Sequence, residues 1–275
     1  MRHHPILRDP RNFQIAVLSA LLVYGVVGLR FDVTPGRVVA TLGAAVAMQW
    51  VMTRAVGLVR FEPRSALISG LSLCLLLRTS SLGIVLAAVA VTIGSKFLLR
   101  ARGKHVFNPT NFGLVVTLAL FDGVWVSPGQ WGSAAAFAFG AACLGALVVW
   151  RAERSDVTWA FLAAWSGLLV GRALWLGDPL TIPLHQLSSG AFLIFAFFMI
   201  SDPKTTPNAR AGRVLFAAVV ALVAGWIQFG MWRENGLLWA LVLCAPLVPL
   251  IDRALPAARF WWPEPRVDTR RFVPL

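Results

Sequence analysis

The chain has 275 residues, of which 58% are hydrophobic and only 13% are charged, and its mean hydropathy is +0.73. Soluble domains average about 45–50% apolar and about 25% charged residues, so this composition excludes an ordinary soluble domain and indicates an integral protein of the lipid bilayer. The formal net charge of +13 does not indicate a nucleic-acid partner. The lysines and arginines stand in short gaps between apolar runs, which is typical of the cytoplasmic flanks of membrane helices.

The apolar runs predict an all-α, polytopic integral membrane protein with about ten transmembrane helices. In chain order, the predicted helices are Phe13–Leu29, Val38–Val59, Ser65–Leu77, Leu82–Leu99, Asn111–Phe121, Trp131–Trp150, Val157–Leu176, Gln186–Ile200, Val214–Phe229 and Gly236–Leu250. The first run has no small-residue cleavage site and is expected to be an uncleaved helix. Crossing a bilayer takes about 20 residues, so the third, fifth and eighth runs are short, as in discontinuous transporter helices.

The distribution of positive charge supports this helix count. With ten spans and both termini in the cytoplasm, 20 of the 25 lysines and arginines fall in cytoplasmic segments. The five on the outer side are Arg30, Arg37, Arg78, Arg172 and Arg233. An excess of cations on the cytoplasmic side is the pattern that orients membrane proteins, and one miscounted span would scramble every later loop.

A weak internal symmetry predicts two inverted five-helix repeats. Ser69-Gly70 opens the short third run, and Ser189-Gly190 opens the short eighth run, which is the third run of the second half. Because each half has an odd number of helices, the halves run in opposite directions through the bilayer. We expect a single membrane domain over residues 1–255, with repeats at about 13–122 and 131–253. Residues 256–275 form a cytoplasmic tail whose aromatic and cationic side chains suit the membrane interface.

Two polar interruptions of the apolar runs carry the chemistry of the chain. In the first, Asn108 is placed to cap a helix that begins at Pro109, with Lys104 and His105 just before it. A helix start with free N–H groups beside two basic residues suits an anionic group, although an ordinary capped helix has the same pattern. The second interruption, around Asp202-Pro203, also has a capped turn as its alternative.

Both interruptions fall on the cytoplasmic side of the predicted topology, so we expect them to face each other inside the bundle. Asn108 is then expected to aim its helix N-terminus at a ligand or at the other break. We expect Asp202 to accept hydrogen bonds from the N–H groups after Pro203, or to pair with Lys96 or Lys104. The three cysteines, Cys74, Cys143 and Cys244, are isolated within apolar runs and are expected to be buried and inert. No motif predicts an iron–sulfur cluster or another metal site.

Three ordered motifs resemble a known family. They are His185 to Pro207 followed by Gly212-Arg213, His105 to Gly113, and Ala66 to Leu71; Pro249 to Asp252 adds the end of the last helix. They are similar to the D subunit of the bacterial Rnf complex and the B subunit of the sodium-pumping NADH:quinone oxidoreductase. The resemblance covers about residues 60–255.

The resemblance implies a ten-helix subunit of an electron-transfer complex in the bacterial inner membrane that holds a flavin, either FMN or riboflavin. Family members attach FMN to a threonine of a Ser-Gly-Ala-Thr motif, but residues 121–132 contain no threonine here, so any flavin is expected to be noncovalent. The candidate cofactor-binding residues are Ser69, Gly70, Lys96, His105, Asn108, Pro109, Asn111, Ser189, Gly190, Asp202, Pro203, Thr205 and Thr206. No residue is predicted to be catalytic.

Two other functions fit the same fold, since one fold serves many functions. The first alternative is a permease or channel for a small solute, in which the protein keeps the inverted-repeat fold and has lost its redox function. The second is a membrane anchor for a soluble enzyme. Other membrane or soluble subunits of an electron-transfer complex are the expected partners under the favoured function.

Overall fold

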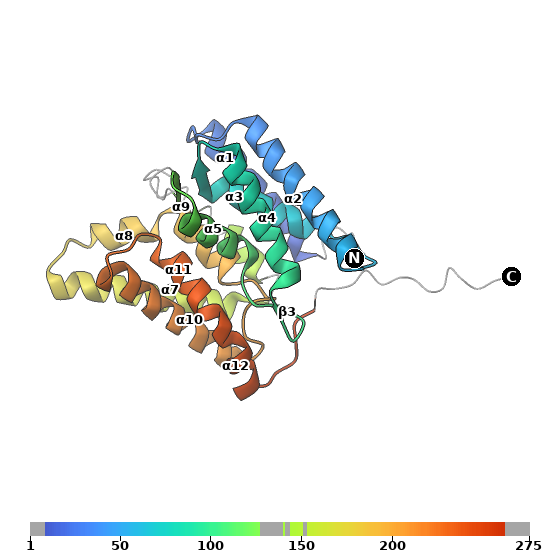
Figure 1. The fold of residues 1–275 in the computed structure, drawn as a ribbon. Helices are drawn as coiled ribbons and strands as arrows, with labels where there is room; N and C mark the ends of the chain where they lie inside the picture. The colour runs from blue at the N-terminus through green and yellow to red at the C-terminus, as the bar shows by residue number, and fades with distance from the viewer. Residues whose placement is uncertain (1–8, 127–139, 141–143, 151–152, 262–275) are drawn as a thin grey trace, which may run out of the picture.

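A computed structural model describes residues 9–126, 140, 144–150 and 153–261 of the chain (Figure 1). The first half contains α1 (Pro10–Val27), α2 (Pro35–Ala55), α3 (Pro63–Leu76), β1 (Leu77–Thr79), α4 (Leu82–Leu98), β2 (Arg100–Ala101), β3 (Lys104–His105), α5 (Pro109–Leu120) and β4 (Val124–Val126). The second half contains α7 (Ser155–Leu176), α8 (Thr181–Leu187), α9 (Gly190–Ile194), the π-helix η3 (Phe195–Met199), α10 (Arg210–Gly225), η4 (Trp226–Gly230), α11 (Gly236–Cys244), the 3₁₀ turn η5 (Ala245–Leu247) and α12 (Val248–Ala254). Residues 144–150 are also helical.

The structure confirms an all-α, polytopic membrane protein. In its described part, five helices are long and apolar enough to cross a membrane, and a sixth span results if the bent pair of α8 with α9 and η3 counts as one. The helices α3, α4 and α5 are apolar but shorter. Nine of the ten predicted runs contain helix at the predicted place, and the remaining one, Trp131–Trp150, lies largely outside the described residues.

Four helices begin two or three residues before their predicted starts, and the physical reason is the same in each. The first helical residue is a proline in α1, α2, α3 and α5. Proline fits this position because its fixed φ suits a helix and its missing N–H has no partner there in any case. The helix therefore starts at the proline, before the apolar run begins.

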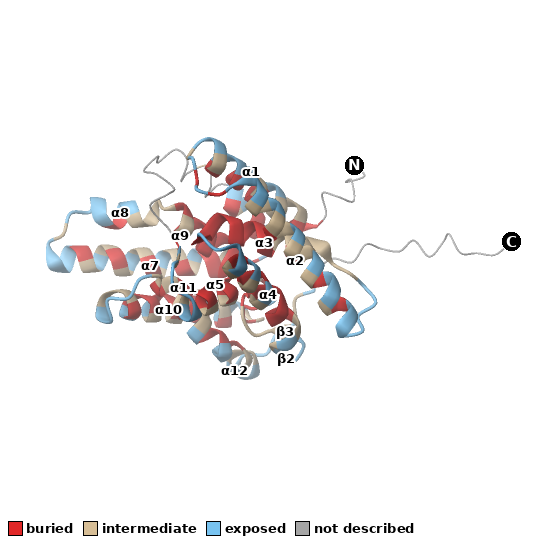
Figure 2. Cartoon of the chain, turned by 45° about the horizontal axis from the view of Figure 1, so that its top comes forward, coloured by how far each residue is buried: buried red, intermediate tan, exposed pale blue. Residues whose placement is uncertain are grey.

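The two halves of the chain occupy opposite sides of the molecule. In Figure 1 the blue and green helices of the first half lie on one side and the yellow to red helices of the second half on the other. Within the first half α3 packs on α1 and α2, and α4 packs on α2 and α5; within the second half α10 packs on α7 and α11. Contacts of α5 with α11 join the halves. The buried residues gather around α3, α5 and α9 (Figure 2).

The short helices α3 and α5 end at a shared ribbon of two strands. β1 follows α3 directly and pairs antiparallel with β4, which follows α5. The buried Arg78 donates hydrogen bonds to the carbonyls of Cys74 and Leu75 near the end of α3 and to that of Leu77. In lipid a broken helix needs such partners, because its last carbonyls have no intrahelical donors.

The Ser-Gly symmetry is only half correct. Ser189 caps α9 and Gly190 is its first residue, as predicted for the opening of a short helix. Ser69 and Gly70 instead lie in the middle of α3, which begins at Pro63. A Cβ at Gly70 would approach the Leu42 side chain to 2.9 Å, so this glycine allows α2 and α3 to approach closely.

Candidate functional site

The two predicted interruptions meet at one end of the bundle. Asn108 Nδ2 donates to the Met199 carbonyl at 3.3 Å and to Asp202 Oδ2 at 3.4 Å, so the start of α5 touches the end of η3. Asn108 Oδ1 also accepts from the backbone N–H of Asn111 at 3.0 Å, which confirms that Asn108 caps a helix beginning at Pro109. The amide therefore joins two segments that are about ninety residues apart in sequence.

The Asp202 turn is held by its own neighbours. The Lys204 N–H donates to Asp202 Oδ1 at 3.0 Å, as predicted for the N–H groups after Pro203. The hydroxyls of Thr205 and Thr206 donate to the Asp202 carbonyl at 3.3 and 3.1 Å. The two threonines thus close the turn and do not line the cavity beside it.

A cavity of about 230 Å³, which we name cavity A, lies between the two interruptions and the helices around them. Seven candidate residues line it: Ser69, Lys96, His105, Asn108, Pro109, Asp202 and Pro203. The N-terminal parts of α3 and α5 form one side, and the segment from Phe197 to Lys204 forms another. The structure therefore brings about half of the candidate residues to a single site.

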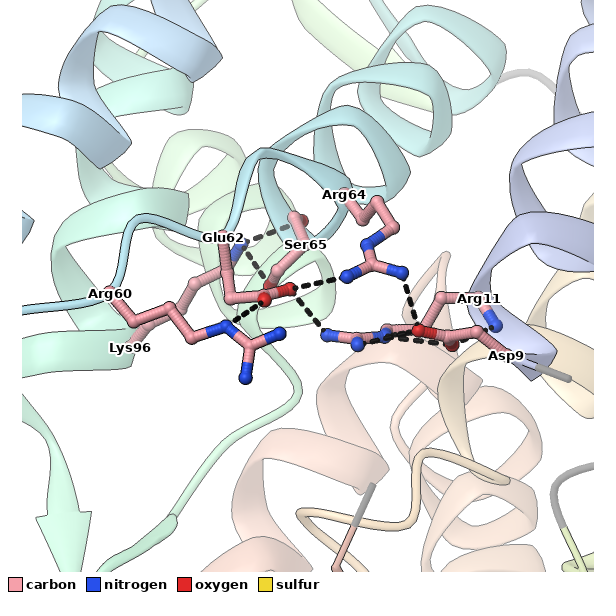
Figure 3. A network of polar contacts seen from close by, with 7 residues as sticks. All are labelled: Asp9, Arg11, Arg60, Glu62, Arg64, Ser65 and Lys96. Carbon is pink, nitrogen blue, oxygen red and sulfur yellow. Dashed lines mark hydrogen bonds and ion pairs between the residues drawn. The ribbon is translucent and has the colours of Figure 1, made fainter. Parts of the chain in front are cut away.

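Lys96 is the most deeply buried cation of cavity A, with 4% of its surface exposed. The prediction that Asp202 pairs with Lys96 or Lys104 is wrong. Lys96 Nζ donates to the carbonyl and the hydroxyl of Ser65 at 2.8 and 3.1 Å (Figure 3). Lys104 reaches Asp252 at 2.8 Å instead. An ionisable side chain buried in a membrane helix is expensive and is usually retained for function.

An ion-pair network closes the mouth of cavity A where α1 and α3 begin. Figure 3 shows Glu62 between the guanidinium groups of Arg60 and Arg11, while Asp9 holds Arg11 and Arg64. The distances from Arg11 to Asp9 and to Glu62 are 2.6 and 2.7 Å. Two carboxylates thus face three arginines, so this side of the mouth keeps a positive surplus.

The protonation states in the loops follow from burial and from the charges of nearby cations. Desolvation raises the pKa of the Asp202 carboxyl above its usual range, although the Lys204 N–H and nearby cations oppose the shift. Burial, and then the charges of Lys204, Lys96 and Arg100, lower the pKa of His105 to about 3. His105 is therefore neutral at physiological pH and offers cavity A hydrogen-bonding nitrogens without adding charge.

Two polar groups of the wall lack partners. Within the described part of the chain, Gln49 Oε1 and His105 Nδ1 are buried and accept or donate no hydrogen bond. Buried polar atoms of proteins are normally paired, so unpaired atoms lining a cavity point to an absent ligand or water. Gln49 and its neighbour Thr53, one turn later, were not among the predicted residues. The sequence signal that marks them is two polar residues four positions apart in a mostly apolar run, which places them on one face of the helix. In the structure Thr41 and Ala45 are buried on the same face.

The remaining candidates lie outside cavity A. Asn111 points the other way and donates to the Leu238 carbonyl at 3.0 Å, which ties α5 to α11. Gly70 serves helix packing. Ser189 lines another cavity, cavity C, of about 640 Å³, whereas Gly190 is the buried first residue of α9 and lines neither cavity. Cavity C lies at the starts of α9 and α11 and touches Leu76 at the end of α3.

Cavities A and C therefore lie at opposite ends of the short helices. Cavity A borders the starts of α3 and α5 and the end of η3, whereas cavity C borders the starts of α9 and α11 and the end of α3. Two short helices of the first half, α3 and α5, begin at cavity A, whereas the short α9 and the longer span that starts with α11 begin at cavity C in the second half. An inverted repeat has this geometry, while the repeat boundaries proposed above stay a prediction. Cys74 and Cys244 are buried as expected, and Cys143 lies outside the described residues.

Comparison with known proteins identifies relatives of this chain. A family model described as the NQR2, RnfD, RnfE family matches residues 123–260. The D subunit of the ion-translocating oxidoreductase complex of Sodalis glossinidius is 33% identical over 112 residues, which are 39% of this chain and 32% of the relative. The protein of the same name from Citrobacter koseri is 37% identical over 76 residues, 28% of this chain and 22% of the relative. That of Escherichia coli O9:H4 is 30% identical over 143 residues, 50% of this chain and 38% of the relative. The chain thus matches less than half the length of these relatives.

Proposed function

Because the chain belongs to the NQR2, RnfD, RnfE family, we propose that it is an electron-transport subunit of the bacterial inner membrane that holds a flavin noncovalently in cavity A. Its relatives are named as subunits of an ion-translocating oxidoreductase complex, so the expected partners are other subunits of such a complex. The single observation that carries the cofactor proposal is the pair of buried, unpartnered polar atoms, Gln49 Oε1 and His105 Nδ1, in the wall of one cavity.

The residues of cavity A fit a flavin in both chemistry and arrangement. Gln49 and His105 offer unpaired polar atoms to the polar edge of a flavin ring, while Phe197 and Phe198 offer apolar surface to its faces. Drug-sized ligands occupy pockets of about 300–1,000 Å³. Cavity A alone is smaller, so it would enclose only part of a flavin; a second cavity adjoins it and shares part of its wall.

A bound flavin would supply one- and two-electron transfer, and the protein would supply placement and electrostatics. Lys96 lines the same wall, and in its protonated form it favours a ligand that gains negative charge. Arg11 and Glu62 of the ion-pair network line the same cavity. The candidate residues Ser69 and Asp202 line the same space and are expected to contact the ligand or its water.

The absence of a threonine from residues 121–132 predicts a noncovalent flavin, and residues 127–132 lie outside the described part of the chain. The full chain, purified in mild detergent, should absorb between about 350 and 500 nm, a range typical of flavins. Acid precipitation should release this absorbance into the supernatant, and a denaturing gel under ultraviolet light should show no fluorescent band. A colourless protein contradicts flavin binding, and a fluorescent band contradicts noncovalent attachment.

Two matched variants test whether the flavin lies in cavity A. Gln49→Leu should lose most of the bound flavin, because it removes the unpartnered acceptor at nearly constant volume. Gln228→Leu makes the same change in the wall of cavity C and should keep the flavin. Equal flavin content in both variants would refute the placement.

The second candidate function, a permease for a small solute, is favoured by one observation. Cavities A and C border the starts of short helices at opposite ends of the bundle, as expected for a solute path through inverted repeats. Uptake of a labelled solute into vesicles that contain flavin-free protein supports this function. Vesicles that contain flavin-bound protein and take up no solute support the electron-transport function.

A further inference from the structure

The second cavity, which we name cavity B, has about 210 Å³ and opens beside the mouth of cavity A. Its wall is built from five separate parts of the chain: the start of α1, the entry to α3, the β2–β3 hairpin, the turn that contains Pro203, and the stretch that follows α12. Six cationic side chains line it, namely Arg11, Arg60, Arg100, Lys104, Lys204 and Arg259. The lining contains a single carboxylate, that of Glu62.

Three of these cations form no ion pair with the described part of the chain. Arg11 and Arg60 pair with Glu62 (Figure 3), and Lys104 pairs with Asp252. Within the described residues, no carboxylate oxygen lies within 4.0 Å of the charged nitrogens of Arg100, Lys204 or Arg259. Burial lowers the pKa of Lys204, and the charges of Arg11 and Arg100 lower it further against the opposing charge of Asp202. The cavity therefore has a positive field that an anion would relieve.

Arg100 and Arg259 are held in place, and each uses a single one of its side-chain donors among the described residues. Arg100 Nη2 donates to the Gly103 carbonyl at 3.0 Å, and Arg259 Nη1 donates to the Arg102 carbonyl at 3.1 Å. Arg259 also stacks over the Trp261 ring, with 4.6 Å to its centroid. Gly103 has a φ of +77° and lacks the Cβ that would lie 3.0 Å from Arg259, so the hairpin leaves room for this guanidinium. Each guanidinium has five N–H donors in a planar fork, and this fork matches the oxygens of a phosphate.

The geometry points to cavity B as a binding site for a phosphate group, with Arg100, Lys204 and Arg259 as its ligands. The inference does not depend on a flavin in cavity A. Two sources share this chemistry: the headgroup of an anionic phospholipid and a soluble phosphate compound. The surroundings favour the lipid, because the apolar Val59 is fully exposed beside Arg60 and Trp261 is 72% exposed at the rim. In the predicted topology this end faces the cytoplasm, where anionic lipids attract basic segments.

The test uses the full chain in phosphatidylcholine nanodiscs, into which phosphatidylglycerol is titrated while bound lipid is counted by native mass spectrometry. Inorganic phosphate is titrated separately by calorimetry. Arg259→Gln should weaken binding about tenfold, since it removes a charge-assisted hydrogen-bonding fork, and Arg259→Lys should recover part of the loss. Lys204→Gln removes a charge without removing a side-chain hydrogen bond seen in the described residues, and it should also weaken binding. Arg253→Gln, an exposed arginine of α12 outside the cavity, is the matched control and should change binding less than about twofold.

Saturable binding of phosphatidylglycerol that inorganic phosphate does not displace assigns the site to a lipid headgroup. Binding of inorganic phosphate with no preference for phosphatidylglycerol over phosphatidylcholine assigns it to a soluble phosphate. In either case binding should weaken as salt rises, because the groups are near the surface. The inference is overturned if the protein binds neither phosphatidylglycerol nor inorganic phosphate. It is also overturned if Arg259→Gln and Lys204→Gln both bind with wild-type affinity. A colourless protein that still binds phosphatidylglycerol refutes the flavin proposal alone.

Discussion

At the scale of single residues, the Asn108 side chain makes two kinds of bond. Its oxygen caps α5, and its nitrogen reaches the Met199 carbonyl and Asp202. We expect Asn108→Ala to lower the free energy of unfolding by about 2 kcal/mol, of which the cap accounts for about 1 kcal/mol and the buried bond for about 1 kcal/mol. Thermal unfolding in one detergent measures the loss.

A double-mutant cycle separates a shared site from two independent turns. Because Asn108 and Asp202 are in contact, the combined variant Asn108→Ala/Asp202→Ala should lose at least about 0.5 kcal/mol less than the sum of the single losses. Ser81 caps α4 without contacting either residue, so Asn108→Ala/Ser81→Ala should be additive. Strict additivity in the first pair would show that the contact between the interruptions contributes nothing.

His105 predicts a dependence of stability on pH. Its pKa is lowered to about 3 in the folded chain, against about 6.5 for an unperturbed histidine. The unfolded chain therefore binds a proton below about pH 6.5 that the folded chain does not bind until about pH 3. The contribution of His105 to stability is complete above pH 6.5 and is lost as the pH falls through this range. In His105→Gln the thermal midpoint should fall less steeply between pH 7 and pH 4, whereas the matched change His185→Gln should keep the wild-type slope.

Residue types in the sequence were sufficient to find Asn108 as a cap and Asp202 as the acceptor of a turn, since both are local contacts. The partner of Lys96 was not predictable. A lysine side chain has four flexible carbons and reaches whichever acceptor the packing presents, and here α3 presents Ser65. Gln49 was missed because its burial depends on how α2 is rotated against α3.

At the scale of elements, Lys104 joins three segments at one point. Its ammonium group donates to the Thr206 carbonyl, to Asn208 and to Asp252, while Asp252 also accepts from the Asn208 N–H at 2.7 Å. The β2–β3 hairpin, the turn after Asp202 and α12 are thereby held together. We expect Lys104→Met to cost about 3 kcal/mol, since it leaves the buried Asp252 carboxylate unpaired.

Two further variants test this junction by thermal unfolding. Lys104→Met/Asp252→Leu removes both charges and should be more stable than Lys104→Met alone. Lys204→Met is the matched lysine control, because the Lys204 side chain makes no hydrogen bond or ion pair with the described residues, and it should change the midpoint little. If Lys104→Met were as stable as the wild type, the ion pair between Lys104 and Asp252 would contribute nothing to holding the junction.

Helix positions were largely predictable from apolar runs, but their ends were not. Hydropathy does not indicate where these helices begin. Each begins at a proline that follows a polar residue, namely Asp9, Thr34, Glu62 or Asn108. Hydropathy also does not indicate the bend of 51° between α8 and the helix that follows, because an apolar run reads the same whether straight or bent.

At the scale of the whole molecule, the charge distribution fixes a testable orientation. Cavities A and B lie at the end of the bundle that carries Lys104 and Asn208, which the charge distribution assigns to the cytoplasm. Reporter fusions after Lys104 and after Asn208 should be active in the cytoplasm, and fusions after Gly123 and Gly177 should be active outside. A cytoplasmic signal at Gly123 would refute the orientation and the ten-span topology together.

Cavity B shows what a sequence does not reveal at this scale. Its cations come from positions 11, 60, 100, 104, 204 and 259, and each taken alone resembles an ordinary loop arginine or lysine flanking a membrane helix. Only the fold brings them to one wall. The tail up to Trp261 likewise reads as a simple interfacial anchor, whereas Arg259 turns back to the β2–β3 hairpin.

The strand ribbon at the ends of α3 and α5 has a mechanical consequence. The pairing of Leu77 with Val126, Arg78 with Trp125 and Thr79 with Val124 yokes the two short helices at their far ends, while their starts border cavity A. If one of them tilted alone, it would break the ladder and expose polar backbone where lipid offers no replacement partner. If α3 and α5 moved together relative to α9 and η3, every hydrogen bond of the ribbon would be kept. On this side of cavity A, a movement that preserves the ribbon has to carry α3 and α5 together.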